Sequence, residues 1–189
     1  AAAAVISGFA FRYNKTGDMD YMQQIKTEIF NATNEVRIGC GLQPVAYSNC
    51  LDRMGQIHTN EMYTHKFFLH DNPYCKKVES LSDRLEYCGL VKLYDMVGEN
   101  LADYPAVDDL VIISPITQLA EKIKPRPLLP AQEVCRKIIR GWYNSPGHRA
   151  NLLCADYNYV GFGLLLYPKM CYGVKLKYLL VTQNFGRTR

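Results

Sequence analysis

The sequence predicts an α/β protein: a three-layer α/β/α sandwich with a small antiparallel central sheet. Apolar residues recur with helical spacing between residues 18 and 153, whereas the C-terminal part changes to runs rich in Val, Leu, Tyr and Phe. Helices that flank a small sheet bury their apolar faces in such layers. The 189 residues fit one domain. We expect an N-terminal extension over 1–17 and a single domain over 18–189.

Periodicity and capping signals place the helices. The first is expected over 18–36 and the second over 48–63, with Ser48 as the N-cap of the second. A third is expected over 130–143, and Ser145-Pro146 opens a short helix to residue 153, because proline suits the first helical position. The residues expected to face the core are Met22, Ile25, Ile29 and Val36, then Leu51, Met54, His58 and Met62, then Val134, Ile138 and Trp142.

Two strands and one insertion complete the expected fold. The segments 159–167 and 176–185 have the composition of buried strands, and the stretch 168–173 between them predicts an antiparallel pair. The stretch 104–130 contains five prolines and cannot form one long helix. We therefore interpret it as an inserted loop.

Composition excludes several classes of protein. The net charge of +4 is small and the basic residues are spread along the chain, which does not indicate a nucleic acid partner. No stretch approaches the about 20 apolar residues that a transmembrane helix needs. The seven cysteines contain no Cys-x-x-Cys pair, which favours disulfides in an oxidising compartment over a zinc ribbon. Buried free thiols are the alternative.

An odd number of cysteines leaves at least one thiol without an internal partner. We expect the pairs Cys75–Cys88 and Cys154–Cys171, each of which closes a modest loop. Cys135 is expected to be unpaired, because it lies within a helical pattern.

Three distant segments contain residues suited to chemistry. His70 follows two aromatic residues just past a helix, Glu99 lies between Gly98 and Asn100, and His148 lies in the first turn of the short helix. Two imidazoles and a carboxylate are suitable zinc ligands, with a fourth position open to a water that the metal would activate. A hydrogen-bonded structural cluster is the alternative. The positive end of the helix dipole favours neutral His148.

These segments, in this order, resemble the motifs of the CAP superfamily (cysteine-rich secretory proteins, antigen 5 and pathogenesis-related 1, with an SCP-like domain). The motifs are Phe67-Phe68-x-His70, the segment 98–102 and the segment 142–153, and 159–163 and 183–186 resemble the closing strands of that superfamily. The resemblance covers about residues 21–186 outside the insertion. The segment 145–151 is similar to the branch common in bacteria.

The resemblance implies a central cleft lined by two histidines and two glutamates, which binds divalent metal in some members. The histidines correspond to His70 and His148 and one glutamate to Glu99, whereas the second glutamate would fall on Ser145. This departure weakens the full four-residue site. Asp71, Asn100 and Ser145 are the other residues expected beside the cleft.

The function implied is that of a protein secreted to the extracellular space, periplasm or cell envelope that binds a ligand or partner, with or without Zn²⁺ or another divalent cation. A small ligand, a lipid or a protein surface would be its partner. The alternative is a metal-dependent, protease-like hydrolase in which His70, His148 and Glu99 are catalytic. The missing second carboxylate counts against that alternative, since such an enzyme needs a base besides its metal ligands. No particular reaction is assigned.

The remaining histidines are given structural roles. His58 shares a helix face with Met54 and Met62, which predicts a core histidine. His65 follows in the same segment and is expected in a solvated turn.

Overall fold

The computed structural model describes residues 17–107, 127–171 and 174–189. The helices and strands along the chain are α1 (Gly17–Gly39), β1 (Ala46–Tyr47), α2 (Asn49–His65), the short 3-10 helix η1 (Lys76–Val78), α3 (Leu81–Tyr87), β2 (Tyr94–Pro105), α5 (Ala131–Asn144), α6 (Pro146–Leu152), β3 (Tyr159–Cys171) and β4 (Val174–Thr188). The predicted extension over 1–17 lies almost wholly outside the described residues, as does the part of the predicted insertion at 108–126.

The strands form one sheet in the order β1-β3-β4-β2. β4 pairs antiparallel with both long neighbours, and β1 joins the far side of β3 in parallel through two residue pairs. The sheet is therefore mixed at one margin and antiparallel elsewhere. β2 is the opposite margin, where Glu99 lies directly across from Asn184.

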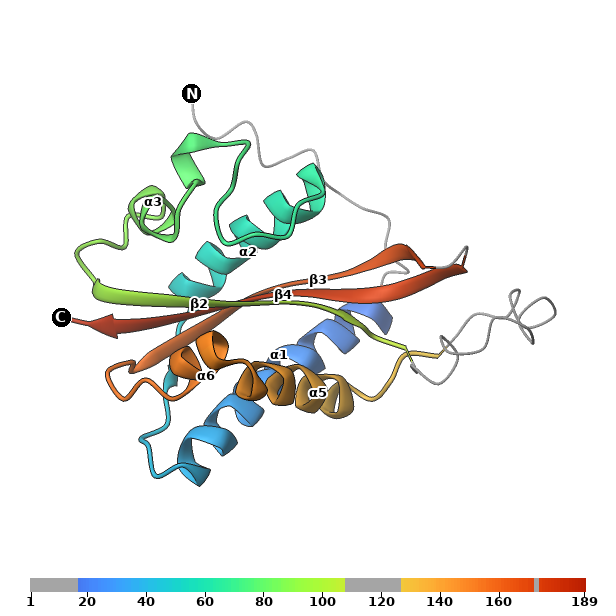
Figure 1. Ribbon diagram of the computed structural model, residues 1–189, viewed down its shortest axis with the longest axis horizontal. Helices are drawn as coiled ribbons and strands as arrows, with labels where there is room; N and C mark the ends of the chain where they lie inside the picture. The colour runs from blue at the N-terminus through green and yellow to red at the C-terminus, as the bar shows by residue number, and fades with distance from the viewer. Residues whose placement is uncertain (1–16, 108–126, 172–173) are drawn as a thin grey trace.

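Helices cover both faces of the sheet, which confirms the predicted three layers. Figure 1 shows α2 and α3 on one side of the strands and α1, α5 and α6 on the other. The larger core lies between the sheet and α1, α5 and α6, and two smaller apolar clusters lie beneath α2 and α3. This arrangement brings two helical layers, built from different parts of the chain, to the same margin strand β2.

The predicted helices are confirmed to within a few residues. Ser48 caps α2, and its side chain accepts a hydrogen bond from the backbone N–H of Leu51. Within α1, Ile25 and Ile29 are fully buried, whereas Met22 and Val36 are half-buried. The other residues predicted to face the core are all buried.

Several elements differ from expectation, and the short elements β1 and η1 were not predicted. β3 continues through Pro168 to Cys171, because the hairpin is longer than its apolar composition indicates. β2 was not predicted, because Gly98, Glu99 and Asn100 interrupt its apolar residues and the strand shows no regular alternation. The capped helix α3 was also not predicted, although Ser80 and Asp83 form a capping box at its start.

Glycines allow the backbone of α2 to lie directly on the sheet. A side chain at Gly163 would place its Cβ 2.2 Å from the carbonyl carbon and oxygen of Gly55. A Cβ at Gly161 would lie 2.3 Å from the backbone nitrogen of Asp52. These positions accept only hydrogen, so that α2 and β3 pack backbone to backbone.

The predicted disulfides are absent from the described parts of the chain, which contain all seven cysteines as free thiols. Cys154 lies before β3 and Cys171 ends it, and a strand of that length spans roughly 40 Å. A disulfide needs Cα atoms within about 7 Å. Cys88 and Cys50 both pack against the cluster under α2, and Cys75 is a separate free thiol. The predictions for Cys75–Cys88 and Cys154–Cys171 are therefore wrong.

Cys135 is unpaired, as predicted, and fully buried within α5. Its thiol faces the carbonyl oxygen of Ile25, with 3.5 Å between Sγ and O. Burial raises the pKa of this thiol to about 12, so it packs as a small apolar group. None of the helices within the described ranges has the length and apolar character required to cross a membrane.

Candidate functional site

Glu99 lies on β2 with its side chain turned toward the layer of α2 and α3. Only 2% of that side chain is exposed. Because a buried carboxylate is stable only when its oxygens are paired, each oxygen needs a partner. Oε1 accepts from Nδ1 of His70 at 2.9 Å, and Oε2 accepts from Nη2 of Arg84 at 2.8 Å. The amide of Asn184, oriented so that its oxygen accepts from the N–H of Gly55, donates to Oε2 at 3.3 Å.

The His70 ring is held by this carboxylate rather than by packing. Its side chain is 57% exposed. Since a carboxylate accepts, Nδ1 carries the hydrogen, and the neutral ring turns Nε2 outward as an acceptor. The hydrogen bond to Glu99 raises the pKa of His70 against the opposing effect of partial burial. His70 therefore remains charged to higher pH than an ordinary histidine.

Arg84 is the residue that the sequence analysis missed. It projects from α3, is fully buried, and pairs with Glu99. Its Nη1 donates to the carbonyl oxygen of His70 at 3.0 Å and also to those of Val78 and Glu79. Nothing in the sequence of this seven-residue helix indicates such a partner. Only the juxtaposition with β2 shows it.

His58 is a core histidine, as predicted, and it approaches the same carboxylate. It is fully buried on α2, with Nε2 3.0 Å from the carbonyl oxygen of Leu69 and 3.9 Å from Oε1 of Glu99. The carbonyl accepts, so Nε2 carries the hydrogen, and Nδ1 is buried without a hydrogen-bond partner among the described residues. Burial lowers the pKa of His58 despite the nearby Glu99 carboxylate. The ring is neutral, and its contact with Glu99 is not an ion pair.

Protonation of His58 should therefore lower the free energy of unfolding as the pH falls. The unfolded chain has a histidine pKa of about 6.5, and the folded value is lower, so protons bind preferentially to the unfolded state below that pH. Wild type should lose stability relative to His58→Gln as pH falls from about 6.5, by up to about 1.4 kcal/mol per pH unit. Urea unfolding of both proteins between pH 7.5 and 5 measures the difference. A constant difference across that range would contradict a buried neutral His58.

His148 reaches the site from the other layer. It lies in α6, and its ring centroid is 6.5 Å from that of His70. Asn100, fully buried, donates to the backbone oxygen of His148 at 3.2 Å, and Asn151 donates to the backbone oxygen of Glu99 at 2.9 Å. The pKa of His148 is lowered, first by burial and then by the charge of His70. The predicted direction holds, and burial is its largest cause.

The side chains of Glu99 and Asn100 serve opposite layers because neighbouring residues on a strand face opposite ways. Glu99 meets Arg84 of α3, whereas Asn100 accepts from Asn151 of α6 and donates to Gln183, which in turn donates to Thr33 of α1. One dipeptide thus fixes His70 on one side of the sheet and His148 on the other. The three segments singled out in the sequence meet at this margin.

The other predicted site residues lie differently. Asp71 is exposed, and Asn100 supports the backbone of His148 from the interior rather than facing outward with the rings. Ser145 is the N-cap residue of α6, yet within the described structure its side chain makes no capping hydrogen bond. His65 is the last residue of α2, is 41% exposed, and stacks on Tyr74.

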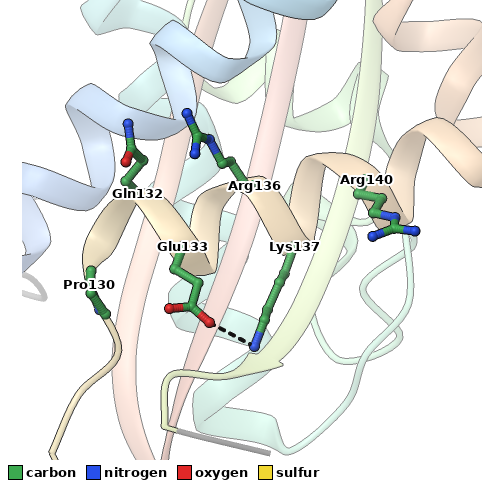
Figure 2. A pocket seen from close by; sticks show the side chains of 6 residues that line it. All are labelled: Pro130, Gln132, Glu133, Arg136, Lys137 and Arg140. Atoms are coloured by element: carbon green, nitrogen blue, oxygen red, sulfur yellow. Dashed lines mark ion pairs between the residues drawn. The ribbon is translucent and has the colours of Figure 1, made fainter.

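Two hollows on the surface lie away from these residues in the fold. One is lined by the outer face of α5, where Figure 2 shows Arg136 and Arg140 one turn apart and Lys137 paired with Glu133. The second lies between that helix and α1. Neither hollow is lined by His70, Glu99 or His148.

The donors at β2 do not fit the predicted three-ligand zinc site as they are arranged. Among the described residues there is no group of three or more His, Cys, Asp or Glu side chains placed to hold a metal ion. Both oxygens of Glu99 are engaged, and Arg84 holds a positive charge against one of them. His70 and His148 alone are fewer than the three protein ligands of a catalytic zinc site.

Comparison with known proteins places the chain in a family. The model of the cysteine-rich secretory protein (CAP) family matches residues 30–185. The chain is 31% identical over 137 residues to the uncharacterized membrane protein YlbC of Bacillus subtilis, covering 72% of this chain and 30% of that protein. The match is thus to less than a third of the length of this relative.

Two solved structures share the fold. An extracellular protein with an SCP domain from Bacillus anthracis has a TM-score of 0.57 and 24% identity, over 87% of this chain and 41% of that one. An outer surface protein of Borrelia burgdorferi has a TM-score of 0.54 and 14% identity, over 92% of this chain and 97% of that one.

The fold and the meeting of the three motifs define a CAP-type α/β/α sandwich. The chain belongs to the cysteine-rich secretory protein (CAP) family, since the family model spans most of its length. The relatives found are bacterial, in agreement with the predicted bacterial-type branch.

Proposed function

We propose that this chain is an extracellular or cell-envelope binding module and that His70 and His148 bind an anionic group of its ligand or partner. The location is supported by the two structural relatives, which are described as an extracellular and an outer surface protein. The binding role is supported by one observation above all: two imidazoles from opposite layers lie 6.5 Å apart, centroid to centroid.

Charge favours an anion over a cation at this pair. Arg84 and Glu99 compensate each other, so protonation of His70 leaves one net positive charge among these three residues. The protonated ring donates from Nε2, which Glu99 leaves facing away from the carboxylate. A carboxylate or phosphate oxygen would accept that hydrogen bond, and a neutral His148 would supply a second N–H.

The zinc and hydrolase alternatives receive less support. Glu99 could serve as a direct ligand of Zn²⁺ only by releasing Arg84 or His70, which would leave a buried group without its partner. Without Glu99, the outward Nε2 of His70 and the ring of His148 are two ligands, fewer than the three of a catalytic zinc site. A hydrolase would need a further base, and Ser145 stands where the family has its second glutamate. No observation favours a reaction, and we propose none.

Imidazole NMR signals test the binding role directly. Titration of the chain with phosphate and acetate at pH 6 should give saturable shifts of the His70 and His148 signals. His70→Gln and His148→Gln should each weaken binding by about tenfold, which corresponds to the loss of one charge-assisted hydrogen bond. His65→Gln, which alters an exposed histidine outside the pair, is the matched control and should bind as wild type does.

Three results would contradict the proposal. If neither phosphate nor acetate produced a saturable shift, this pair would be excluded as an anion site. Equal losses in all three variants would make the shifts a general charge effect. Saturable binding of Zn²⁺ at one ion per chain, abolished by His70→Gln and by His148→Gln, would instead support the metal-binding alternative.

A further inference from the structure

We propose that Arg84 is the positioning residue of the histidine pair, because one guanidinium holds both the backbone and, through Glu99, the ring of His70. The inference rests on the proposed function, since positioning has a consequence only if the pair binds a ligand. It assigns a role outside the three motifs, to a helix that the sequence analysis did not predict.

The contacts form a closed cycle. Nη1 of Arg84 donates to the backbone oxygen of His70 at 3.0 Å, and Nη2 donates to Oε2 of Glu99 at 2.8 Å. The other carboxylate oxygen accepts from Nδ1 of the same histidine at 2.9 Å. The cycle thus runs from the guanidinium through the carboxylate and imidazole and back through the His70 backbone.

Packing alone does not set the orientation of this ring. The His70 side chain is 57% exposed, and its neighbour Leu69 is 56% exposed. By contrast, the side chains of Arg84 and Glu99 are 0% and 2% exposed. The rigid pair therefore lies in the interior, and the exposed partner at the surface is fixed to it through Nδ1 and its carbonyl oxygen.

The planar geometry of arginine suits this task better than lysine does. A guanidinium presents donors in a fixed fork, so two bonds to different groups also fix the angle between them. A lysine at this position keeps the charge that compensates Glu99 but offers a single flexible ammonium. Arg84→Lys therefore separates the positioning role from charge compensation.

A second buried arginine provides the matched control. Arg37 of α1 is also fully buried, and it donates to backbone oxygens after α1, at the end of α6 and in the segment before β3. Those acceptors are the carbonyls of Gln43, Leu152, Cys154 and Tyr157. Arg37→Lys should destabilise the fold as Arg84→Lys does, without touching Glu99 or His70.

The test is the tautomer of neutral His70, read from the ¹⁵N shifts of its imidazole at pH 8.5 in the full chain. Wild type and Arg37→Lys should both show hydrogen on Nδ1, whereas Arg84→Lys should show a mixture with the Nε2–H tautomer. Phosphate affinity at pH 6 should fall at least fivefold in Arg84→Lys and less than twofold in Arg37→Lys. Equal behaviour of the two variants would overturn the proposal.

A measurement on wild type keeps the inference testable if Arg84→Lys does not fold. Both Nη groups of Arg84 are bonded, so rotation about the Cζ–N bonds should be slow and the two should give separate NMR signals at 25 °C. A single averaged signal would overturn the proposal. The tautomer and the rotation do not involve added ligand, so a failure of phosphate to bind wild type would count against the proposed function alone.

Discussion

Replacing Glu99 by glutamine should destabilise the protein by about 3–5 kcal/mol, the range for breaking a buried ion pair. The substitution keeps the shape of the side chain but leaves the guanidinium of Arg84, which is fully buried, without its counter-charge. It also removes the largest cause of the raised pKa of His70. Urea unfolding at pH 7 measures the first effect, and NMR titration of the imidazole, which should show a lower pKa, measures the second.

Asp18→Asn is the matched control for this change. Asp18 accepts from Lys177 at 2.7 and 2.9 Å, but the lysine side chain is 43% exposed. Such solvated pairs contribute about 0–1 kcal/mol. A loss in Glu99→Gln no larger than that in Asp18→Asn would show that the buried pair is not a major source of stability. An unchanged pKa of His70 would show that Glu99 does not hold its ring.

Gly163→Ala should be among the most damaging single-methyl changes in the chain. The new Cβ would lie 2.2 Å from the backbone of Gly55, far inside van der Waals contact, and neither main chain can turn aside as a side chain can. We expect a loss at or above the upper end of the about 1–3 kcal/mol typical of overpacking. α2 would have to move off β3, and His58 and the backbone of Leu69 would move with it.

Gly141→Ala tests whether the effect comes from this contact. Gly141 lies within α5, and among the described residues nothing comes within 4 Å of an added Cβ. Alanine there should stabilise the helix by about 0.5–1 kcal/mol. Urea midpoints of the two variants should therefore shift in opposite directions. A neutral Gly163→Ala would mean that α2 and β3 are not in backbone contact.

The helices α1, α2, α5 and α6 were predictable because their signals are local. Ile25 and Ile29 in α1, and Val134, Ile138 and Trp142 in α5, recur with the spacing of one helix face, and burial follows that spacing. The margin strand β2 has no such signal. Its middle holds Glu99 and Asn100, polar residues that are buried because partners elsewhere in the chain bond them.

The site was predictable only as far as its motifs extend. His70, Glu99 and His148 stand in recognisable segments, and the structure brings them together. Arg84 has no motif, since its importance comes from acceptors on three other segments of the chain. The disulfide prediction was wrong for the opposite reason. Short separations along the chain indicated the pairs, whereas the extended strand β3 places Cys171 far from Cys154.

The two imidazoles belong to helical layers that contact the sheet independently, one through the loop after α2 and the other through α6. The distance between the two rings therefore depends on the positions of the two helical layers on the faces of the sheet at β2. A partner that binds both rings would link the two helical layers at the margin of the sheet. It would oppose the sliding of one layer relative to the other. The resistance of the domain to this sliding should therefore increase as a larger fraction of the protein binds ligand.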